Sequence, residues 1–260
     1  MLTGLIIGDV VGKPALDFLI SKLDDLKTFY KTDFIIVNGE NAAGGKGITT
    51  RMADDLKTAG VNAITSGNHI WQAKSKDVLT KHFGYVLRPQ NYPNSNEGTG
   101  HAVFEVKGHK IAVINAIGRS FMPDAVDNPF YSLDALIEKL QAETKTIIMD
   151  FHGETTAEKI AYGRYLDGKV SCVVGTHTHV QTADERVLPK GTAYITDLGM
   201  TGPIDSVIGM KVELAIKRFR KASPTNYELA NSNQQINGVV VSIDEKTGKA
   251  DSIQRVQITE

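Results

Sequence analysis

The chain alternates short apolar runs with helical stretches, and this alternation restricts its fold more than any other feature. Apolar runs at residues 5–7, 34–37 and 61–65 are each followed by a turn rich in glycine and polar residues. Leucine and isoleucine recur at helical spacing through residues 15–29, and a second helix is expected to end near 59–60. A repeated strand–loop–helix unit is typical of an α/β protein with parallel strands.

The rest of the chain predicts further strands in a less regular order. Residues 102–106 and 110–115 favour an antiparallel pair, after a loop at 88–100. Further strands are expected at 146–149, 170–174, 192–197, 238–243 and 252–258, and helices at 133–140, 156–166 and 206–221. We find no solenoid repeat, low-complexity segment or linker, so we interpret residues 1–260 as one domain with two sheets, or with one mixed sheet folded on itself.

Composition and charge exclude several classes of protein. Hydrophobic residues make up 41% of the chain and charged residues 23%, which are ordinary globular values. A net charge of −1 argues against a long nucleic-acid groove or a polybasic membrane anchor, so no stable nucleic-acid partner is expected. The single cysteine, Cys172, lies in an apolar run and is interpreted as a small buried hydrophobe.

The N-terminal sequence and the lack of long apolar runs favour a cytoplasmic protein. The chain begins directly with the strand-like run Leu2–Ile7 rather than with a basic segment followed by a long apolar one. No run approaches the ~18 apolar residues of a membrane span. One cysteine allows no disulfide within the chain, which suits a reducing compartment. Association between copies of the chain is left open.

Residues that can bind a metal follow the ends of five apolar runs. They are Asp9, Glu40, Asn41, Asn68, His69, His152, His177 and His179. Sites in open α/β sheets form just beyond the carboxyl ends of the strands, so these side chains are expected to converge. In an extended chain His177 and His179 would point to the same side, which aims two imidazoles at a common point. Taken singly, Asp9 could instead cap a helix, Asn68 could serve a turn, and His152 could be a bonded loop histidine.

The types of these ligands indicate the chemistry. Carboxylates, amide oxygens and imidazoles without sulfur suit first-row divalent metals such as iron, manganese, zinc or cobalt. Six or seven ligands exceed what one tetrahedral ion uses, so two ions bridged by a carboxylate fit better. Such a pair clamps the attacking and leaving oxygens of a displacement at phosphorus. The sequence therefore predicts a dinuclear phosphoryl-transfer site.

At these positions the chain resembles the calcineurin-like dinuclear metallophosphoesterases. The matching blocks are Gly8-Asp9-Val10-Val11, Asn38-Gly39-Glu40-Asn41, Gly67-Asn68-His69-Ile70, His152 and Thr176-His177-Thr178-His179. Two departures are Val11, where the superfamily has a histidine, and Glu40 followed by Asn41, where it has an aspartate. Together with Asp197-Leu198-Gly199-Met200-Thr201-Gly202, they are similar to one bacterial subgroup, the YmdB-like phosphodiesterases.

This resemblance implies a fold, a site and a reaction. The fold is a four-layer α-β-β-α sandwich of two mixed sheets. Asp9, Glu40 and His179 would hold the first metal ion, and the second would be held by Glu40, Asn41, Asn68, His152 and His177. Metal-bridged hydroxide would attack phosphorus, and His69 would act as general acid. The expected substrates are small-molecule 2′,3′-cyclic nucleotides, with 3′,5′-cyclic nucleotides as a further class. Iron is the expected metal, with manganese or zinc as alternatives.

Other functions remain open on the same residues. A phosphomonoesterase or nucleotidase, or a phosphoprotein phosphatase, would use this site on a different substrate. A regulatory protein could use the metal or a bound nucleotide as a signal without catalysis. An amidohydrolase is disfavoured, because its His-x-His normally closes the first strand, where this chain has Asp9-Val10-Val11. The loop 44–47 could cradle a phosphate or form a mobile rim, and the basic helix 206–221 is interpreted as a solvated face.

Overall fold

The computed structural model describes residues 1–72, 77–222, 224 and 226–260, and its strands form two mixed sheets. The first sheet has the order β2-β11-β12-β1-β3-β4, with β13 paired to β12. Its strands are β1 (Leu2–Ile7), β2 (Asp9–Val10), β3 (Phe34–Asn38), β4 (Ala63–Thr65), β11 (Met200–Pro203), β12 (Gln234–Ile243) and β13 (Ala250–Thr259). Because β1, β3 and β4 are parallel, they all end at one edge of this sheet.

The second sheet has the order β5-β6-β7-β8-β10-β9. Its strands are β5 (His101–Val106), β6 (His109–Ile117), β7 (Thr146–His152), β8 (Cys172–Thr176), β9 (Arg186–Val187) and β10 (Ala193–Ile195). Strands β6, β7, β8 and β10 are parallel, while β5 and β6 form the predicted hairpin. Its two turn residues, Lys107 and Gly108, have φ of 52° and 78°, as a tight hairpin turn requires.

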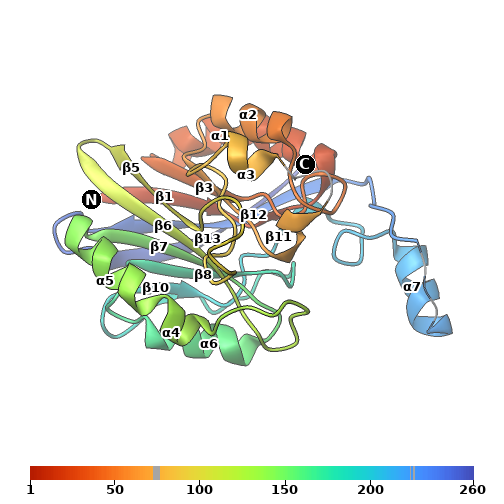
Figure 1. Ribbon diagram of the computed structural model, residues 1–260. Helices are drawn as coiled ribbons and strands as arrows, with labels where there is room; N and C mark the ends of the chain where they lie inside the picture. Colours follow the sequence, from red (N-terminus) through yellow and green to blue (C-terminus); the bar gives the residue numbers. More distant parts are fainter. Residues whose placement is uncertain (73–76, 223, 225) are drawn as a thin grey trace.

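Helices cover the outer face of each sheet (Figure 1). Those on the first sheet are α1 (Gly12–Tyr30), α2 (Thr50–Thr58) and α3 (Val78–Lys81), and those on the second are α4 (Pro129–Ser132), α5 (Asp134–Glu143) and α6 (Thr156–Tyr165). The predicted four-layer α-β-β-α sandwich is thereby confirmed. Helix α7 (Val212–Lys221) projects from the body of the molecule. Among the described residues, no helix combines the length and apolarity needed to cross a bilayer.

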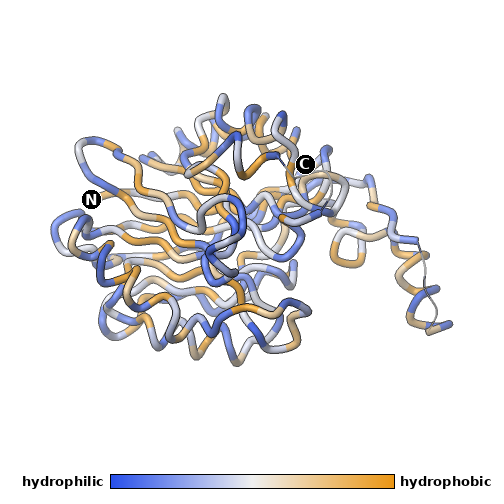
Figure 2. The backbone as a smooth tube through the Cα atoms, in the orientation of Figure 1, coloured by the Kyte–Doolittle hydropathy of each residue, from blue (hydrophilic) through white to orange (hydrophobic). Residues whose placement is uncertain are grey.

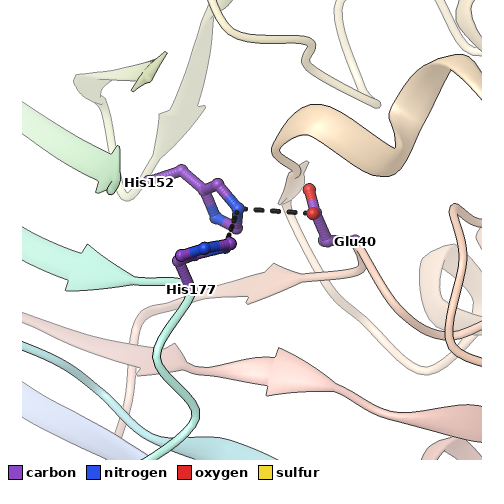
Figure 3. Close-up of side chains that lie close together, drawn as sticks. All are labelled: Glu40, His152 and His177. Atoms are coloured by element: carbon purple, nitrogen blue, oxygen red, sulfur yellow. Dashed lines mark hydrogen bonds and ion pairs between the residues drawn. The ribbon is translucent and has the colours of Figure 1, made fainter. Parts of the chain in front are cut away.

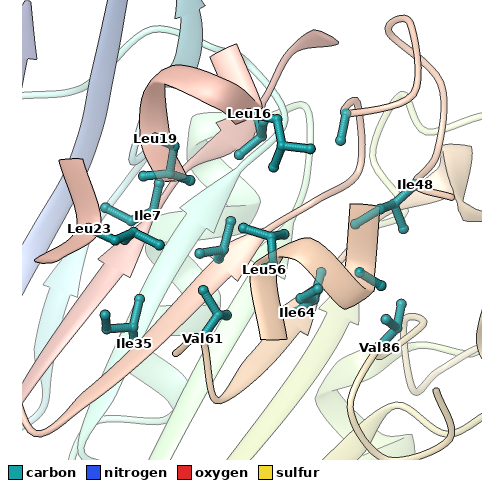
Figure 4. Close-up of a cluster of buried hydrophobic side chains, with 14 of the residues drawn as sticks. Ile7, Leu16, Leu19, Leu23, Ile35, Ile48, Leu56, Val61, Ile64 and Val86 are labelled. Atoms are coloured by element: carbon teal, nitrogen blue, oxygen red, sulfur yellow. The ribbon is translucent and has the colours of Figure 1, made fainter. Parts of the chain in front are cut away.

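Three apolar clusters separate the four layers. Alternate residues of one strand face opposite sides, so Ile7 of β1 packs in the cluster with Leu16 of α1, whereas Ile6 packs between the sheets (Figure 4). Ile148 of β7 faces the same central cluster, and its neighbour Met149 faces the helices of the second sheet. Figure 2 shows the hydrophobic segments running along the strands. The sheets are therefore held face to face, and their ends are left to form a site.

Some element boundaries differ from the sequence prediction. Strand β8 covers Cys172–Thr176 rather than 170–174. Helix α7 begins at Val212 rather than 206, because Ile208 and Gly209 have φ of 48° and 100° and cannot continue a helix. Strands as short as β2, β9 and β11 were not predicted, since two to four residues carry too little periodicity to be recognised. The single-domain organisation of residues 1–260 stays a prediction.

Candidate metal centre

The strands of both sheets bring the eight predicted residues to the ends where the parallel strands finish. They are Asp9 at the start of β2, Glu40 and Asn41 after β3, Asn68 and His69 in a 3₁₀ turn (Asn68–Trp71) after β4, His152 at the end of β7, and His177 and His179 after β8. The two sheets face each other, so residues far apart in sequence can meet between their ends. The predicted convergence of these side chains at the strand ends is therefore present.

Glu40, His152 and His177 form the tightest part of this group (Figure 3). Their nearest ligand atoms all lie within 4.8 Å of one another. His152 Nε2 lies 3.3 Å from Glu40 Oε1 and 3.0 Å from His177 Nδ1. Asn68 Oδ1 lies 3.3 Å from the same nitrogen. One carboxylate, two imidazoles and one amide oxygen thus converge within the range that a single cation can contact.

Asn41 joins the remaining candidates. Its Oδ1 lies 2.8 Å from Nδ1 of His69, and its Nδ2 lies 3.1 Å from Nε2 of His179. Asp9 is close by, because its Oδ2 accepts a hydrogen bond of 3.2 Å from the amide of His177. The charges of Glu40 and His179 also act on the Asp9 carboxyl. All eight residues therefore belong to one connected group.

Two buried carboxylate oxygens in this group have no hydrogen-bond donor among the residues that the structure describes. Asp9 and Glu40 are both 0% exposed. Asp9 Oδ1 and Glu40 Oε2 find no hydrogen-bond partner in the described part of the chain. A buried carboxylate without a partner is costly, and the usual remedies are an ion pair or a metal ion. The donor set, two carboxylates among imidazoles and amides, fits divalent cations at these two oxygens.

The pKa values of Glu40, His152 and His177 are shifted by burial and by the charges that these residues place on one another. Burial opposes ionisation of Glu40, but the charge of His152 and hydrogen bonds from His152 and His69 hold its pKa well below the usual range. Burial also opposes ionisation of His152, yet the Glu40 carboxylate outweighs it and raises the pKa of His152 to about 9. Burial and the charge of His152 lower the pKa of His177 to about 3. Glu40 is therefore ionised beside a protonated His152, and a metal ion bound at His152 Nε2 would have to displace that proton.

Asp150 supports the site from below, and the sequence analysis did not single it out. Its carboxylate accepts hydrogen bonds from Asn38 Nδ2 at 2.9 Å, Thr65 Oγ1 at 2.5 Å and Thr176 Oγ1 at 2.7 Å. Thr176 Oγ1 in turn lies 3.0 Å from Nδ1 of His152, which orients the ring so that Nε2 faces Glu40. Asp150 thus ties together the ends of β3, β4, β7 and β8. Its position two residues before His152, on the same face of β7, was the available signal.

The expectation that His177 and His179 lie in an extended chain after the strand is wrong. β8 ends at Thr176, and the two histidines have φ of 100° and 66°. The backbone of residues 177–179, rather than an extended strand end, therefore sets the directions of the two imidazole rings. His179 Nδ1 lies 2.9 Å from the carbonyl oxygen of Ile208, so its other nitrogen faces Asn41. Backbone in this region is unfavourable for a side chain with a Cβ, and such strain often accompanies functional sites.

A cavity of about 410 Å³ opens beside the group. Its lining includes His69, His177 and His179 from the site, and Lys46 from the glycine-rich loop. Arg218 of α7 also reaches its wall, so the basic helix is not only a solvated face. The volume lies within the ~300–1,000 Å³ typical of small-molecule sites. A small anionic ligand could therefore reach the candidate metal ligands.

Replacing Gly67 by alanine is expected to weaken metal binding about 10- to 100-fold. A Cβ at this position would lie 2.1 Å from Glu40 Oε2 and 2.3 Å from His152 Nε2, so both ligand atoms would have to move. Calorimetric titration of the metal-free protein with Mn²⁺ measures the change. Gly84→Ala is the control, since a Cβ there strains the backbone but meets nothing within 4 Å. Equal affinities for Gly67→Ala and the wild type would contradict the assignment.

The chain is similar to known proteins over almost its whole length. The family model of the YmdB-like proteins matches residues 5–256. A 2′,3′-cyclic-nucleotide 2′-phosphodiesterase of Bacillus subtilis (strain 168) is 47% identical over 256 residues, which cover 98% of this chain and 97% of that protein.

Two solved structures extend the likeness to the whole fold. One, described as a novel phosphatase from Mycoplasma pneumoniae, is 40% identical with a TM-score of 0.93, and the match covers 100% of this chain and 94% of that one. The other, a hypothetical protein from Thermus thermophilus, is 38% identical with a TM-score of 0.92, and the match covers both chains completely. The expected class of enzyme, a metallophosphoesterase, is confirmed by this family. The chain belongs to the family of YmdB-like proteins.

Proposed function

We propose that this protein is a metal-dependent phosphodiesterase that hydrolyses 2′,3′-cyclic nucleotides, with 3′,5′-cyclic nucleotides as a further substrate class. The observation that carries the proposal is the pair of buried oxygens, Asp9 Oδ1 and Glu40 Oε2, which find no donor within the described residues. Both lie in a group of imidazoles next to a cavity, where cations and an anionic substrate can meet. The Bacillus subtilis relative, named for 2′,3′-cyclic nucleotides, supports this choice of substrate.

Seven residues would hold two metal ions. The first ion would take Asp9, Glu40 and His179, and the second would take Glu40, Asn41, Asn68, His152 and His177. When bound, the two cations would neutralise the phosphate, stabilise charge that develops on its oxygens and lower the pKa of a bound water. Glu40 suits the shared position because it contacts His152 through Oε1 while Oε2 remains without a donor among the described residues. Iron is our expectation for the metal, with manganese or zinc as alternatives, because the donor set contains no sulfur.

The contacts of His69 support the role of general acid. Its Nδ1 lies 2.8 Å from Asn41 Oδ1 and 3.1 Å from Glu40 Oε1, and both oxygens are acceptors, so Nδ1 carries a proton. Nε2, on the far side of the ring, is left for the ligand in the cavity that His69 lines. In the proposed reaction a water molecule gives one proton to the solvent, its oxygen forms a new bond to phosphorus, and the bond from phosphorus to a ribose oxygen breaks. His69 gives its Nε2 proton to that departing oxygen.

The cavity wall has the chemistry that a nucleotide needs. Lys46 and Arg218 line it and would attract the phosphate through their positive charges. Tyr227 also lines it, and an aromatic ring in the wall would suit stacking on a base. These residues suit a mononucleotide, with a cation for the phosphate and an aromatic ring for the base, and the cavity of about 410 Å³ is of the size of a small-molecule site.

A substrate panel tests the proposal. The purified protein, loaded with Fe²⁺ or Mn²⁺, is assayed with 2′,3′-cyclic AMP, 3′,5′-cyclic AMP, the corresponding monophosphates and a phosphopeptide. We expect the highest kcat/KM with the 2′,3′-cyclic nucleotide. Faster hydrolysis of monoesters would indicate a nucleotidase, and faster hydrolysis of the phosphopeptide a protein phosphatase. Tight nucleotide binding without turnover would favour a non-enzymatic sensor, and each of these results would overturn the proposal.

A further inference from the structure

The segment that carries His177 and His179 cannot hold its own shape. Both histidines have positive φ, at 100° and 66°, a conformation that side chains with a Cβ rarely adopt. The segment also lies beyond the end of β8 at Thr176, so no strand pairing fixes it. Such backbone persists only where the surrounding structure determines it. Contacts with other parts of the chain must therefore hold this segment in place.

Thr178, between the two histidines, is held by one buried carboxylate. Asp197 Oδ2 accepts hydrogen bonds from the Thr178 amide at 3.1 Å and from its hydroxyl at 2.6 Å. Oδ1 of the same residue accepts a 2.8 Å bond from the amide of Gly199. Asp197 is 0% exposed. One side chain thus fixes the histidine segment against the loop that leads into β11.

That loop is itself connected to the other candidate ligands. The amide of Met200 donates a 3.0 Å hydrogen bond to the carbonyl oxygen of His179. Met200 also pairs with Asp9 in the register of β11 and β2. Asp197 therefore lies where the histidine segment and the strand that carries Asp9 come together, and a shift there would move ligands on both sides.

Lys159 of α6 balances the charge of Asp197. Its Nζ lies 2.6 Å from Asp197 Oδ2 and 3.5 Å from Thr178 Oγ1, and the lysine is only 1% exposed. Gly175 of β8 makes room for it, because a Cβ there would lie 2.9 Å from Lys159 Cδ and 1.8 Å from the carbonyl oxygen of Thr196. Burying a lysine and an aspartate together is energetically costly, since apolar residues would fill the same space with less desolvation.

We propose that Lys159 and Asp197 are positioning residues that hold the His177–His179 segment in the backbone conformation required for metal binding. This inference rests on the proposed function, because it assigns the pair a role at the same metal centre. Neither residue is a candidate ligand, and neither lines the cavity. They act on the two histidines through Thr178, which lies between His177 and His179 in the sequence and is hydrogen-bonded to Asp197.

Metal titrations of variants test this role. Thr178→Val keeps both charges and removes the hydroxyl, with its bond to Asp197 and its 3.5 Å contact with Lys159. Lys159→Met removes the cation. We expect Mn²⁺ to bind about 10- to 100-fold more weakly to each, as for other residues that orient metal ligands. The double variant Lys159→Met/Thr178→Val should bind little more weakly than Lys159→Met alone, since both act through Asp197. Calorimetry on the metal-free proteins gives the dissociation constants.

A matched variant separates positioning from general loss of stability. Asp167 is also buried, at 8% exposure, and accepts backbone hydrogen bonds from Lys190 and Thr192, but it precedes β8 at the end away from the site. Asp167→Asn should lower Tm without changing the affinity for Mn²⁺. Wild-type affinity in Thr178→Val and in folded Lys159→Met would overturn the inference. Failure of the proposed function would show differently, as a wild-type protein that binds no metal or cleaves no phosphodiester.

Discussion

Replacing Glu40 by glutamine is expected to lower kcat for 2′,3′-cyclic nucleotide hydrolysis by about 10³-fold, as for the loss of a central electrostatic group. Glutamine has almost the same shape, so the change removes charge rather than packing. Glu40 is 0% exposed, and its Oε1 lies 3.1 Å from His69 Nδ1 and 3.3 Å from His152 Nε2. Neutralising it would weaken both proposed metal sites and would replace the charged acceptor beside His69 Nδ1 by a neutral amide oxygen.

Turnover and metal content should be measured on the same preparation. Asp167→Asn is the control, because it also neutralises a buried carboxylate, but one that bonds backbone amides away from the site. The control should keep wild-type turnover and metal content, whereas Glu40→Gln should lose both. Wild-type kcat in Glu40→Gln would mean that this carboxylate is not the shared ligand.

Replacing His69 by alanine is expected to lower kcat for a cyclic nucleotide by about 10²- to 10⁴-fold, the range for loss of a general acid. A ribose oxygen is a poor leaving group and needs a proton as its bond to phosphorus breaks. A p-nitrophenolate leaves without one, so hydrolysis of bis-p-nitrophenyl phosphate should be affected much less. Metal content should stay close to that of the wild type, since His69 is not a proposed ligand.

The two substrates together make the His69 prediction specific. His109→Ala is the control, because His109 is exposed at the start of β6 and far along the strand from the site. It should leave both rates unchanged. An equal loss on both substrates in His69→Ala would show that the residue only maintains the site. No loss on the cyclic nucleotide would remove it from the mechanism.

The fold could be anticipated because its strands carry strong local signals. The strands Phe34–Asn38 and Thr146–His152 are buried on both faces, and each begins with a run that is mostly apolar, so the runs could be recognised without knowing their partners. The two-layer stacking of sheets came from resemblance to a known superfamily, since alternation within one strand does not say what its second face meets. Short strands such as β2 and β11 depend on partners far away in sequence, and no local pattern marks them.

The site was anticipated as a set of residues but not as a geometry. Polar side chains directly after apolar strands predicted the convergence of Glu40, His152 and His177, because parallel strands end at the same edge. The left-handed backbone of His177 and His179 was missed, since no local sequence pattern marks it and the partner of Thr178 between them, Asp197, lies 19 residues further along the chain. Hydrogen bonds between buried polar residues of different elements cannot be recognised from the sequence, because they depend on how the sheets and helices pack together.

The most direct test of this account is to locate the metals in crystals of the protein loaded with Mn²⁺ or purified with iron. Anomalous difference maps recorded at the absorption edge of the metal should show two peaks per chain, about 3.5–4 Å apart, as in two-metal phosphoesterase sites. Glu40 should lie between them, with His152 and His177 at one peak and Asp9 and His179 at the other. A map with no peak beside Glu40, or with metal bound only at other residues, would contradict the account.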